Sequence, residues 1–432
     1  MNSPCNRMRG ACAVALALVT AGALAAPARA GTVVLPFDAP VRSVASADGF
    51  QVAVAALRST GGTIILRPNW YTRTLQIGPR SGPILTIVGE AGARVQSILL
   101  DHANDVTIRH TTIHPMTADG GIHAEYSSNV VIWDDTFTAK STRHIVEVNL
   151  DHSNHVTVRN SDFSHCGDNS PEWSLCLLPQ WAKNVTVRRN KFHDCRGCDF
   201  IHGRAGANLR ILRNRFARAL VCDHSWIKCG HQDAIELFAA DGLLVSRNVF
   251  GVTQLGGAQL YLANATNHVL VKNNKFNRKD PLAPGVVSRV GILVGTRIST
   301  VFPHDVTIEN NTVLSGKIRP DHAAESIVLS PRYASAPLRD RPVIANNIFA
   351  KQLAPNRVCG LARVSTHNII EQGTACDPTD VVGDALLNSH GRPTAASALV
   401  IDKADPAYAP VRDLLDHRRV GPPDIGCYEF VP

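Results

Sequence analysis

Two short stretches of the chain concentrate side chains that could carry out acid–base chemistry. Residues 198–204 read CDFIHGR and residues 231–237 read HQDAIEL. Paired carboxylates suit glycoside hydrolysis, whereas a base combined with positive charge suits proton abstraction beside a carboxylate. The titratable side chains of these two stretches are predicted to be the catalytic residues: Asp199, His202, Arg204, His231, Asp233 and Glu236.

A repeated phrase predicts how these stretches are positioned. In each copy, two apolar residues at a spacing of two form a short strand, a polar corner follows, and an apolar residue, usually Phe, re-enters the core. The copies begin at Val106, Val130, Val156, Val185, Leu209, Leu243, Val269, Val306 and Pro342, at intervals of 24, 26, 29, 24, 34, 26, 37 and 36 residues. A constant unit with connections of variable length is typical of a solenoid.

The polar corner carries an asparagine at equivalent places in six copies. Asparagine tolerates bends and bonds neighbouring backbone, so stacked copies are expected to form a ladder that closes the turn. These residues are Asn190, Asn214, Asn248, Asn274, Asn311 and Asn347. The pattern predicts an all-β, right-handed parallel β-helix rather than a propeller, because no turn-linked blade signature is present.

From about Ile108 to Phe349 the repeat resembles the pectin-lyase-like family of right-handed β-helices. An amphipathic stretch before Gly61-Gly62 resembles that family's N-terminal capping helix, and the ending 424–429 resembles the closing segment of many bacterial members. We therefore expect a signal peptide over residues 1–30 and one β-helix domain over 31–432. Within that domain we expect a cap at about 41–62, ladder coils at about 100–350 and a closing segment at about 351–432.

A second strand precedes each repeated strand, and its register follows from alternation. Two rows of this strand are apolar or small and should face inward. Eight residues before the start of each repeat stand Ile122, Val148, Leu177, Ile201, Ile235 and Tyr261. Six residues before it stand Ala124, Leu150, Pro179, Gly203, Leu237 and Ala263. The two alternate rows should face outward. Seven residues before the start of each repeat stand His123, Asn149, Leu178, His202, Glu236 and Leu262. Five residues before it stand Glu125, Asp151, Gln180, Arg204, Phe238 and Asn264.

The outward rows predict a polar groove across several coils that are about 4.8 Å apart. In the resembled family, the sheet before the asparagine ladder lines the substrate cleft. Asp199 and Asp233 each stand ten residues before the start of the next repeat, so they should stack on adjacent coils. The residues expected to bind substrate are His123, Glu125, Glu147, Asn149, Asp151, Gln180, Lys228 and Trp173.

A polysaccharide lyase acting on a uronate-containing polymer is the favoured reaction. His202 or Arg204 would be the base, and His202 is chemically easier because a free guanidinium stays protonated. Lys228, His231 or a calcium ion held by Asp199, Asp233 and Glu236 would neutralise the substrate. The alternatives are a polygalacturonase-like hydrolase, a C5-epimerase and a non-catalytic polysaccharide-binding or surface-structural solenoid. The chain lacks the Gly-His-Gly and Arg-Ile-Lys segments of such hydrolases.

The N-terminus and the charge balance indicate where the protein works. Residues 1–30 contain Arg7 and Arg9, an apolar run and Ala28-Arg29-Ala30, the order of a secretory signal. We expect a secreted or periplasmic protein with no membrane insertion once the signal is removed. The net charge of +8 is unclustered, which suits an acidic polysaccharide and gives no indication of nucleic-acid binding.

Nine of the eleven cysteines follow the expected signal, and export makes disulfides the default. Cys166 and Cys195 fall at equivalent places on adjacent coils, so they are expected to pair. The short loops between Cys222 and Cys229 and between Cys359 and Cys376 also suit bridges, with Cys176–Cys198 as a weaker proposal and Cys427 left over. A zinc site formed by His193, Cys195, Cys198 and His202 is the less favoured alternative.

Overall fold

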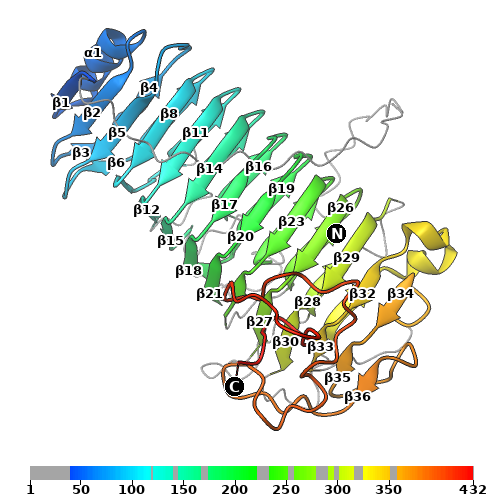
Figure 1. The fold of residues 1–432 in the computed structure, drawn as a ribbon. Helices are drawn as coiled ribbons and strands as arrows, with labels where there is room; N and C mark the ends of the chain where they lie inside the picture. The colour runs from blue at the N-terminus through cyan, green and yellow to red at the C-terminus, as the bar shows by residue number, and fades with distance from the viewer. Residues whose placement is uncertain are drawn as a thin grey trace. The chain divides into compact units, whose positions relative to one another are not determined.

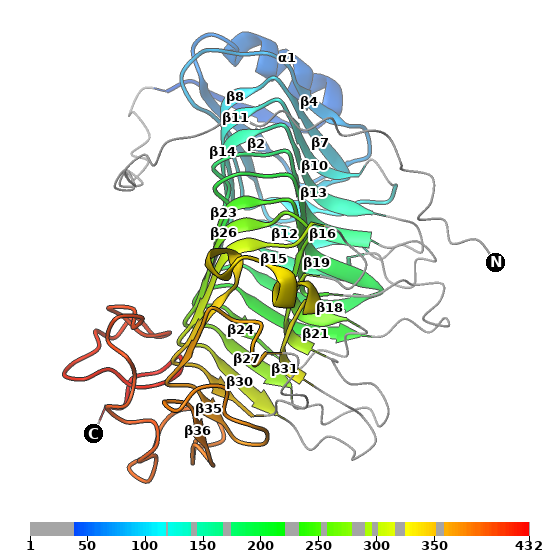
Figure 2. The ribbon, with the colours of Figure 1, turned by 90° about the vertical axis from the view of Figure 1, so that its right-hand side faces the viewer.

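Short strands that repeat along the chain pair in parallel and build three sheets. The computed structural model describes residues 39–117, 120–139, 145–166, 174–220, 233–251, 257–278, 290–295, 301–315, 325–350 and 358–431. Within the described residues, sheets A, C and B hold thirteen, ten and thirteen strands. Between Leu75 and Phe349, each coil adds one strand to sheet C, then one to sheet A, then one to sheet B, and the coils follow one another in chain order (Figures 1 and 2). The described strands before and after these residues belong to sheets A and B alone.

Sheet C carries the longer strands that precede the repeated phrase. Its strands are β4 (Leu75–Ile77), β7 (Ser97–Asp101), β10 (Gly121–Glu125), β13 (Val146–Asp151), β16 (Ser174–Gln180), β19 (Cys198–Arg204), β22 (Ile235–Phe238), β25 (Ala258–Ala263), β28 (Val290–Val294) and β31 (Glu325–Leu329).

Sheet A is formed mainly by the first half of the repeated phrase. Its strands are β1 (Val41–Val44), β2 (Gly62–Leu66), β5 (Leu85–Gly89), β8 (Asn104–Arg109), β11 (Ser128–Trp133), β14 (Asn154–Arg159), β17 (Thr186–Arg188), β20 (Arg210–Leu212), β23 (Asp241–Ser246), β26 (Asn267–Lys272), β29 (His304–Glu309), β32 (Val343–Ala345) and β34 (Val364–Thr366).

Sheet B follows the polar corner of each repeat. Its strands are β3 (Trp70–Tyr71), β6 (Arg94–Val95), β9 (Thr112–Ile113), β12 (Thr136–Thr138), β15 (Asp162–Ser164), β18 (Lys191–Arg196), β21 (Arg215–Leu220), β24 (Val249–Phe250), β27 (Lys275–Arg278), β30 (Thr312–Ser315), β33 (Ile348–Phe349), β35 (Ile369–Ile370) and β36 (Val381–Val382).

One α-helix packs against the first coils, as the sequence predicts. Helix α1 (Ala47–Leu57) is capped by the Ser46 hydroxyl, which accepts the Gly49 N–H at 3.1 Å. The helix buries Phe50, Ala53 and Leu57 and contacts β1, β2 and β4. It therefore covers the apolar end of the solenoid. Two 3₁₀ helices, η2 (Pro331–Ser335) and η3 (Leu338–Asp340), follow β31.

The asparagine corner forms the predicted ladder between sheets A and B. The six ladder residues are at most 1% exposed, and the N–H of each asparagine donates to the side-chain oxygen of the next at 2.9–3.0 Å. The first residue beyond the predicted set, Asn368, continues the ladder by accepting from the Asn347 N–H at 3.0 Å. Each buried turn is thereby supplied with the hydrogen bonds that water cannot provide.

The predicted register of sheet C is confirmed from β10 to β22. Ile201 pairs with Ile235 and His202 pairs with Glu236, so the inward and outward rows continue across these coils. The prediction is wrong at β25, where Glu236 pairs with Tyr261 and Leu237 pairs with Leu262. Tyr261 therefore belongs to the outward row and Leu262 to the inward row.

A longer turn explains this one-residue difference. Two residues separate Phe238 from the start of β23, whereas three residues, 264–266, separate the equivalent Ala263 from the start of β26. Because side chains alternate along a strand, one additional residue in the turn exchanges the two faces when register is counted back from the next strand.

Candidate functional site

His202 lies between two carboxylates on the outward row of sheet C. Its Nδ1 is 3.1 Å from Asp199 Oδ2 and 3.1 Å from Glu236 Oε2. Asp199 and His202 come from β19, and Glu236 is the register partner of His202 on β22. The three ligand-type atoms lie within 4.8 Å of one another. Two adjacent parallel strands thus bring together Asp199 and Glu236, which are 37 positions apart in the chain.

Burial and charge together set the protonation of this group, which we name the sheet C triad (Asp199, His202 and Glu236). The side chains of His202, Asp199 and Glu236 are 10%, 6% and 3% exposed. Burial lowers the pKa of His202, but its hydrogen bonds to the two carboxylates and their negative charges outweigh burial and raise it to about 9. At neutral pH the imidazole is therefore mainly protonated.

Tyr261 extends the triad by one coil. Its register partner is Glu236, and its ring packs edge-on against Phe238 with the ring centres 6.1 Å apart. Burial, and then the charges of Glu236 and Asp233, raise the pKa of the Tyr261 hydroxyl well above its usual value. This hydroxyl therefore keeps its proton at alkaline pH.

Asp199 and Asp233 stack on adjacent coils as predicted, and each carboxylate also bonds backbone. Asp199 Oδ1 accepts the Asp233 N–H at 2.7 Å, and Asp233 Oδ1 accepts the Ala258 N–H. Both residues consequently join the start of one sheet C strand to the next. Asp199 keeps its second oxygen for His202.

Arg204 ends β19 on the second outward row, and its side chain is exposed. It pairs in register with Gln180 on one side and Phe238 on the other. Phe238 also packs on the His202 ring, with the ring centres 5.4 Å apart. The exposed, planar guanidinium of Arg204 is suited to binding a carboxylate through two parallel hydrogen bonds.

The predicted substrate-binding residues of earlier coils lie along the same rows but away from the triad. His123 pairs with Asn149, whereas Glu125 pairs with Asp151, which in turn pairs with Gln180. The His123 row reaches His202 only after two further coils, on β13 and β16. The structure thus brings Asp199, His202 and Glu236 into contact, places Gln180 on the adjacent strand opposite Arg204, and places His123, Glu125, Asn149 and Asp151 further along the solenoid.

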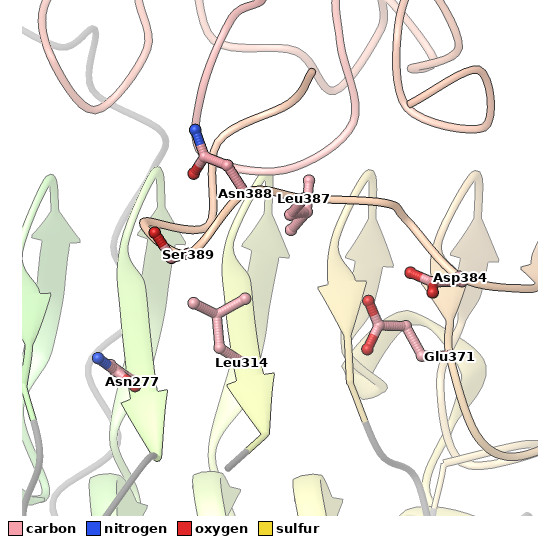
Figure 3. Close-up of a pocket in the computed structure, with 7 residues that line it drawn as sticks. All are labelled: Asn277, Leu314, Glu371, Asp384, Leu387, Asn388 and Ser389. Atoms are coloured by element: carbon pink, nitrogen blue, oxygen red, sulfur yellow. The ribbon is translucent and has the colours of Figure 1, made fainter. Parts of the chain in front are cut away.

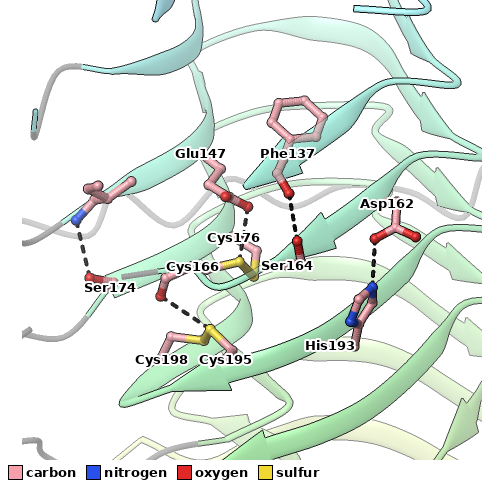
Figure 4. The surroundings of a disulfide bond; sticks show 11 residues. Phe137, Glu147, Asp162, Ser164, Cys166, Ser174, Cys176, His193, Cys195 and Cys198 are labelled. Atoms are coloured by element: carbon pink, nitrogen blue, oxygen red, sulfur yellow. Dashed lines mark hydrogen bonds and ion pairs between the residues drawn. A yellow bond between two sulfur atoms is a disulfide. The ribbon is translucent and has the colours of Figure 1, made fainter. Parts of the chain in front are cut away.

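Glu147 does not reach the surface, and the prediction that it contacts substrate is wrong for this structure. It is 0% exposed, and its Oε2 lies 3.0 Å from Cys166 Sγ (Figure 4). Cys166, which follows β15, therefore lies against Glu147 near the start of β13. His231, Lys228 and Trp173, predicted to act on or bind substrate, lie outside the described residues.

Four cysteines meet beside the start of β19, but they pair differently from the prediction. The disulfides are Cys166–Cys176 and Cys195–Cys198, so the predicted Cys166–Cys195 pair and the weaker Cys176–Cys198 pair are both wrong. Stacking does bring the four sulfurs within 4.8 Å of one another (Figure 4), and such a cluster does not by itself select partners.

The remaining cysteine predictions have separate outcomes. The Cys359–Cys376 disulfide is confirmed, and Cys427 is a buried free thiol. Cys222 and Cys229 lie outside the described residues. The alternative zinc set is not assembled, because His193 bonds Asp162 and Asp194, both at 2.6 Å, whereas His202 belongs to the triad.

The donor atoms do not fit the calcium site predicted at Asp199, Asp233 and Glu236. Calcium prefers a cage of oxygen atoms. In the described residues, the atoms that come together are two carboxylate oxygens and the His202 nitrogen, while Asp233 Oδ1 is bonded to backbone. We therefore derive no catalytic step through calcium.

Tyr261 is the residue that the sequence-based prediction missed. It was assigned to the core because register was counted back from β26 across a turn of unequal length. The alternation of Leu260 and Leu262, which both belong to the main apolar core, was the available signal for the inward face. That alternation leaves Tyr261 on the outer face.

A separate cavity of about 130 Å³ lies near the C-terminal coils. It is lined by Asn277, Leu314, Glu371, Asp384, Leu387, Asn388 and Ser389 (Figure 3). Burial and the neighbouring Asp384 carboxylate raise the pKa of Glu371. None of its lining residues belongs to the sheet C triad, so this cavity is distinct from the candidate site. Among the described residues, no helix has the length and apolar character needed to cross a membrane.

Comparisons with known proteins concern the fold. Solved structures that resemble this chain include a pectate lyase, at 12% identity and a TM-score of 0.47 over 91% of this chain and 97% of that one. A surface adhesin of Streptococcus pneumoniae matches at 12% identity and a TM-score of 0.48, over 75% and 82% of the two chains. A polysaccharide lyase from Pseudopedobacter saltans matches at 14% identity and a TM-score of 0.47, over 82% and 96%.

No curated protein sequence matches the chain. A family model described as the right-handed beta helix region matches residues 96–313, which is half of the sequence and includes strands β7 to β29 together with the sheet C triad. The three parallel sheets and the asparagine ladder agree with that match. The chain therefore belongs to the right-handed β-helix family.

Proposed function

We propose that this protein is a polysaccharide lyase that cleaves an acidic, uronate-containing polysaccharide by β-elimination on the outer face of sheet C. The observation that carries the proposal is the buried imidazole of His202, whose Nδ1 lies 3.1 Å from each of two carboxylates. The exposed Arg204 lies two residues further along the same strand. This arrangement supplies a base and an anion-binding group on one face.

His202 is the general base in this proposal. Because Nδ1 faces Asp199 and Glu236, the neutral ring keeps its proton on Nδ1, and Nε2 becomes the atom that can accept a proton. The two carboxylates raise the pKa to about 9, which makes the neutral ring a stronger base than an ordinary imidazole. At pH 8 about one tenth of the sites would hold the neutral form.

The remaining steps follow from the neighbouring side chains. Arg204 binds the uronate carboxylate and stabilises the negative charge that develops when His202 removes the adjacent C–H proton. The electron pair of that C–H bond forms the new C=C bond as the glycosidic C–O bond breaks. Tyr261, which keeps its proton at alkaline pH, donates it to the departing oxygen.

The proposal includes export and a single mature domain. Residues 1–30 would be removed as a signal peptide, and residues 31–432 would form the secreted or periplasmic β-helix domain. The order of charged, apolar and small residues at the N-terminus supports this assignment.

One observation favours a second candidate, a polygalacturonase-like hydrolase. The carboxylate oxygens of Asp199 and Glu236 that face His202 lie within 4.8 Å of each other, near the spacing of a retaining glycosidase. Both carboxylates, however, bond the same imidazole, which leaves neither poised as an independent acid or nucleophile. We therefore rank hydrolysis second.

The test is incubation of the purified protein with polygalacturonate, alginate and neutral glycans. A lyase releases an unsaturated product that absorbs in the ultraviolet, whereas a hydrolase releases reducing ends without that absorbance. His202→Gln should abolish turnover, and because it also leaves two buried carboxylates without their cation, circular dichroism must show that the variant is folded at the assay temperature. His268→Gln is the matched control, because its imidazole also pairs with an aspartate, Asp241, at 2.6 Å, but is exposed on sheet A. Full activity of the His202 variant would exclude this site.

The pH profile separates the roles of His202. If it is the base, kcat/KM should rise with pH and level off near 9, the pKa of the paired imidazole. Glu236→Gln removes one of the two charges that raise this pKa, so the rising limb should move to lower pH. A rate that instead falls as pH passes 9 would show that His202 acts as an acid.

A further inference from the structure

Arginines gather on the outer face of sheet A, away from the sheet C triad. Arg159 and Arg188 end strands β14 and β17 and pair directly in register, and Arg189 follows at the corner. One coil later, Arg210 pairs with Thr186 on β17. These four residues, named here the arginine strip, span three neighbouring strands (β14, β17 and β20 in Figure 1) at a rise of about 4.8 Å per coil.

The arginine strip has no counter-charge in the part of the chain that the structure describes. No carboxylate there forms an ion pair with any of its four guanidinium groups, and strands β14, β17 and β20 contain no acidic residue. The next corner arginines, Arg213 and Arg247, are paired with Asp416 at 2.8 Å and 2.6 Å. On the preceding corner, Asp134 pairs with His110 at 3.1 Å. The arginine strip therefore lies between corner residues on either side that do have ion-pair partners.

The strip is held in place by packing rather than by ion pairs. The Arg159 guanidinium lies over the Trp133 ring at 4.6 Å, and Arg109 approaches that ring at 5.7 Å. The Nε atom of Arg159 is buried and has no hydrogen-bond partner among the described residues. Burial, and then repulsion from Arg189, lowers the pKa of Arg159. Burial, and then repulsion from Arg159, Arg189 and Arg213, lowers the pKa of Arg188. A bound anion would relieve this repulsion.

We propose that the arginine strip binds a linear acidic polysaccharide along the solenoid, at a site separate from the sheet C triad. Arg159 and Arg188 stack in register, and Arg210 lies on the next strand opposite Thr186, so each of three successive coils presents at least one guanidinium. Such a row complements a chain that carries one carboxylate per sugar, because guanidinium binds carboxylate with two parallel hydrogen bonds. Duplex nucleic acid carries a much denser charge, about one per 1.7 Å of axis, and fits this narrow row less well.

The experiment measures polygalacturonate binding by isothermal titration calorimetry in low salt and in about 0.15 M salt. The double variant Arg159→Gln/Arg188→Gln should bind about tenfold more weakly than the unaltered protein. The control is Arg67→Gln/Arg73→Gln, which makes the same change in net charge. Its arginines are already paired with Glu90 at 3.1 Å and Asp48 at 2.8 Å, and it should bind normally.

Repeating the titration in the His202→Gln background separates this proposal from the catalytic one. In that background too, the Arg159→Gln/Arg188→Gln variant should bind polygalacturonate about tenfold more weakly. In protein that keeps His202, the same double variant should turn over short uronate oligomers at the normal rate. Unchanged polymer binding by the strip variants would overturn the proposal. Equal weakening by the control pair would do the same, and equally tight binding of single-stranded DNA would overturn the choice of a polysaccharide.

Discussion

Burial acts on the carboxylates of sheet C in two opposite ways. Asp199 and Glu236 are buried beside His202, whose positive charge offsets the loss of water. Glu147 is buried without a cation, and burial raises its pKa well above the usual value. One of its oxygens, Oε1, has no hydrogen-bond partner among the described residues. The first two carboxylates are therefore compensated by a cation, whereas the third is a cost to stability near neutral pH.

Glu147→Gln should consequently stabilise the protein as pH rises. In the folded state Glu147 holds its proton above the pH at which an unfolded glutamate releases it, so its contribution is favourable at low pH and is lost as pH rises through the folded pKa. Glutamine has no such proton to release. The thermal midpoint of Glu147→Gln relative to the unaltered protein should therefore be higher at pH 8 than at pH 4.

Glu125→Gln is the matched control on the neighbouring strand, because Glu125 is only partly buried. Its thermal midpoint should change little between the two pH values. A Glu147 variant with the same difference in midpoint at both pH values would show that the carboxyl is ionised in the folded protein.

At the scale of elements, the asparagine ladder ties each coil to the next. Asn248 is 0% exposed, donates to Ile211 O at 2.8 Å, and accepts the Asn214 N–H at 2.9 Å. Removing its side chain leaves both backbone groups unsatisfied inside the protein. Asn248→Ala should lower the free energy of unfolding by about 2 to 4 kcal/mol, measured by chemical denaturation.

Asn154→Ala provides the comparison, since Asn154 is a partly buried strand residue whose side chain accepts one bond, from Asn184 at 2.8 Å. Its loss should cost under about 1 kcal/mol. Equal destabilisation by the two variants would mean that the ladder contributes no more than a surface hydrogen bond.

The sequence predicted these elements because their signals are periodic. The phenylalanines that re-enter the core stack as expected: Phe163, Phe192 and Phe216 lie 4.7 Å and 5.1 Å apart between ring centres. The pairing of His202 with Glu236 followed from the same alternation. Periodicity sets which residues share a face, and that part of the candidate site was predictable.

Other features depend on distances that alternation does not encode. Four sulfurs within 4.8 Å allow several disulfide pairings, and the stacking of equivalent positions does not by itself distinguish the observed pairs, Cys166–Cys176 and Cys195–Cys198. The contact of both Asp199 and Glu236 with one ring nitrogen likewise depends on side-chain geometry rather than on register. Sequence spacing could therefore predict that the cysteines, and the carboxylates and His202, lie close together, but it could not predict which disulfides and hydrogen bonds they form.

At the scale of the whole molecule, the C-terminal segment packs back along the corner between sheets A and B. The Gly426 N–H donates to Asn346 O at 2.8 Å, and the Cys427 N–H donates to the Thr312 hydroxyl at 3.0 Å. Asp416 pairs with Arg213 and Arg247. The segment therefore connects coils that are widely separated in the chain.

Cys427 reports on this packing. Burial raises the pKa of its thiol to about 12, so the thiolate that reacts with alkylating agents is scarce in the folded protein. Peptide mass spectrometry after iodoacetamide treatment should find Cys427 unmodified in native protein and modified after denaturation. Asp416→Ala, which removes the two ion pairs that join the segment to Arg213 and Arg247 on the coils, should accelerate modification.

Asp48→Asn is the control, because it removes an exposed ion pair with Arg73 beside helix α1 at the other end of the solenoid. It should leave the modification rate unchanged. Rapid alkylation of Cys427 in the unaltered native protein would show that the segment is not held against the coils.

The one-residue-longer turn between β25 and β26 has a consequence for how such proteins evolve. Since this turn sets which side chains of β25 point outward, a single insertion or deletion can present a new set of residues beside Glu236 while the strands keep their sequence and the buried ladder is untouched. Changes in turn length, as well as point substitutions, would therefore alter the side chains that face outward beside Glu236.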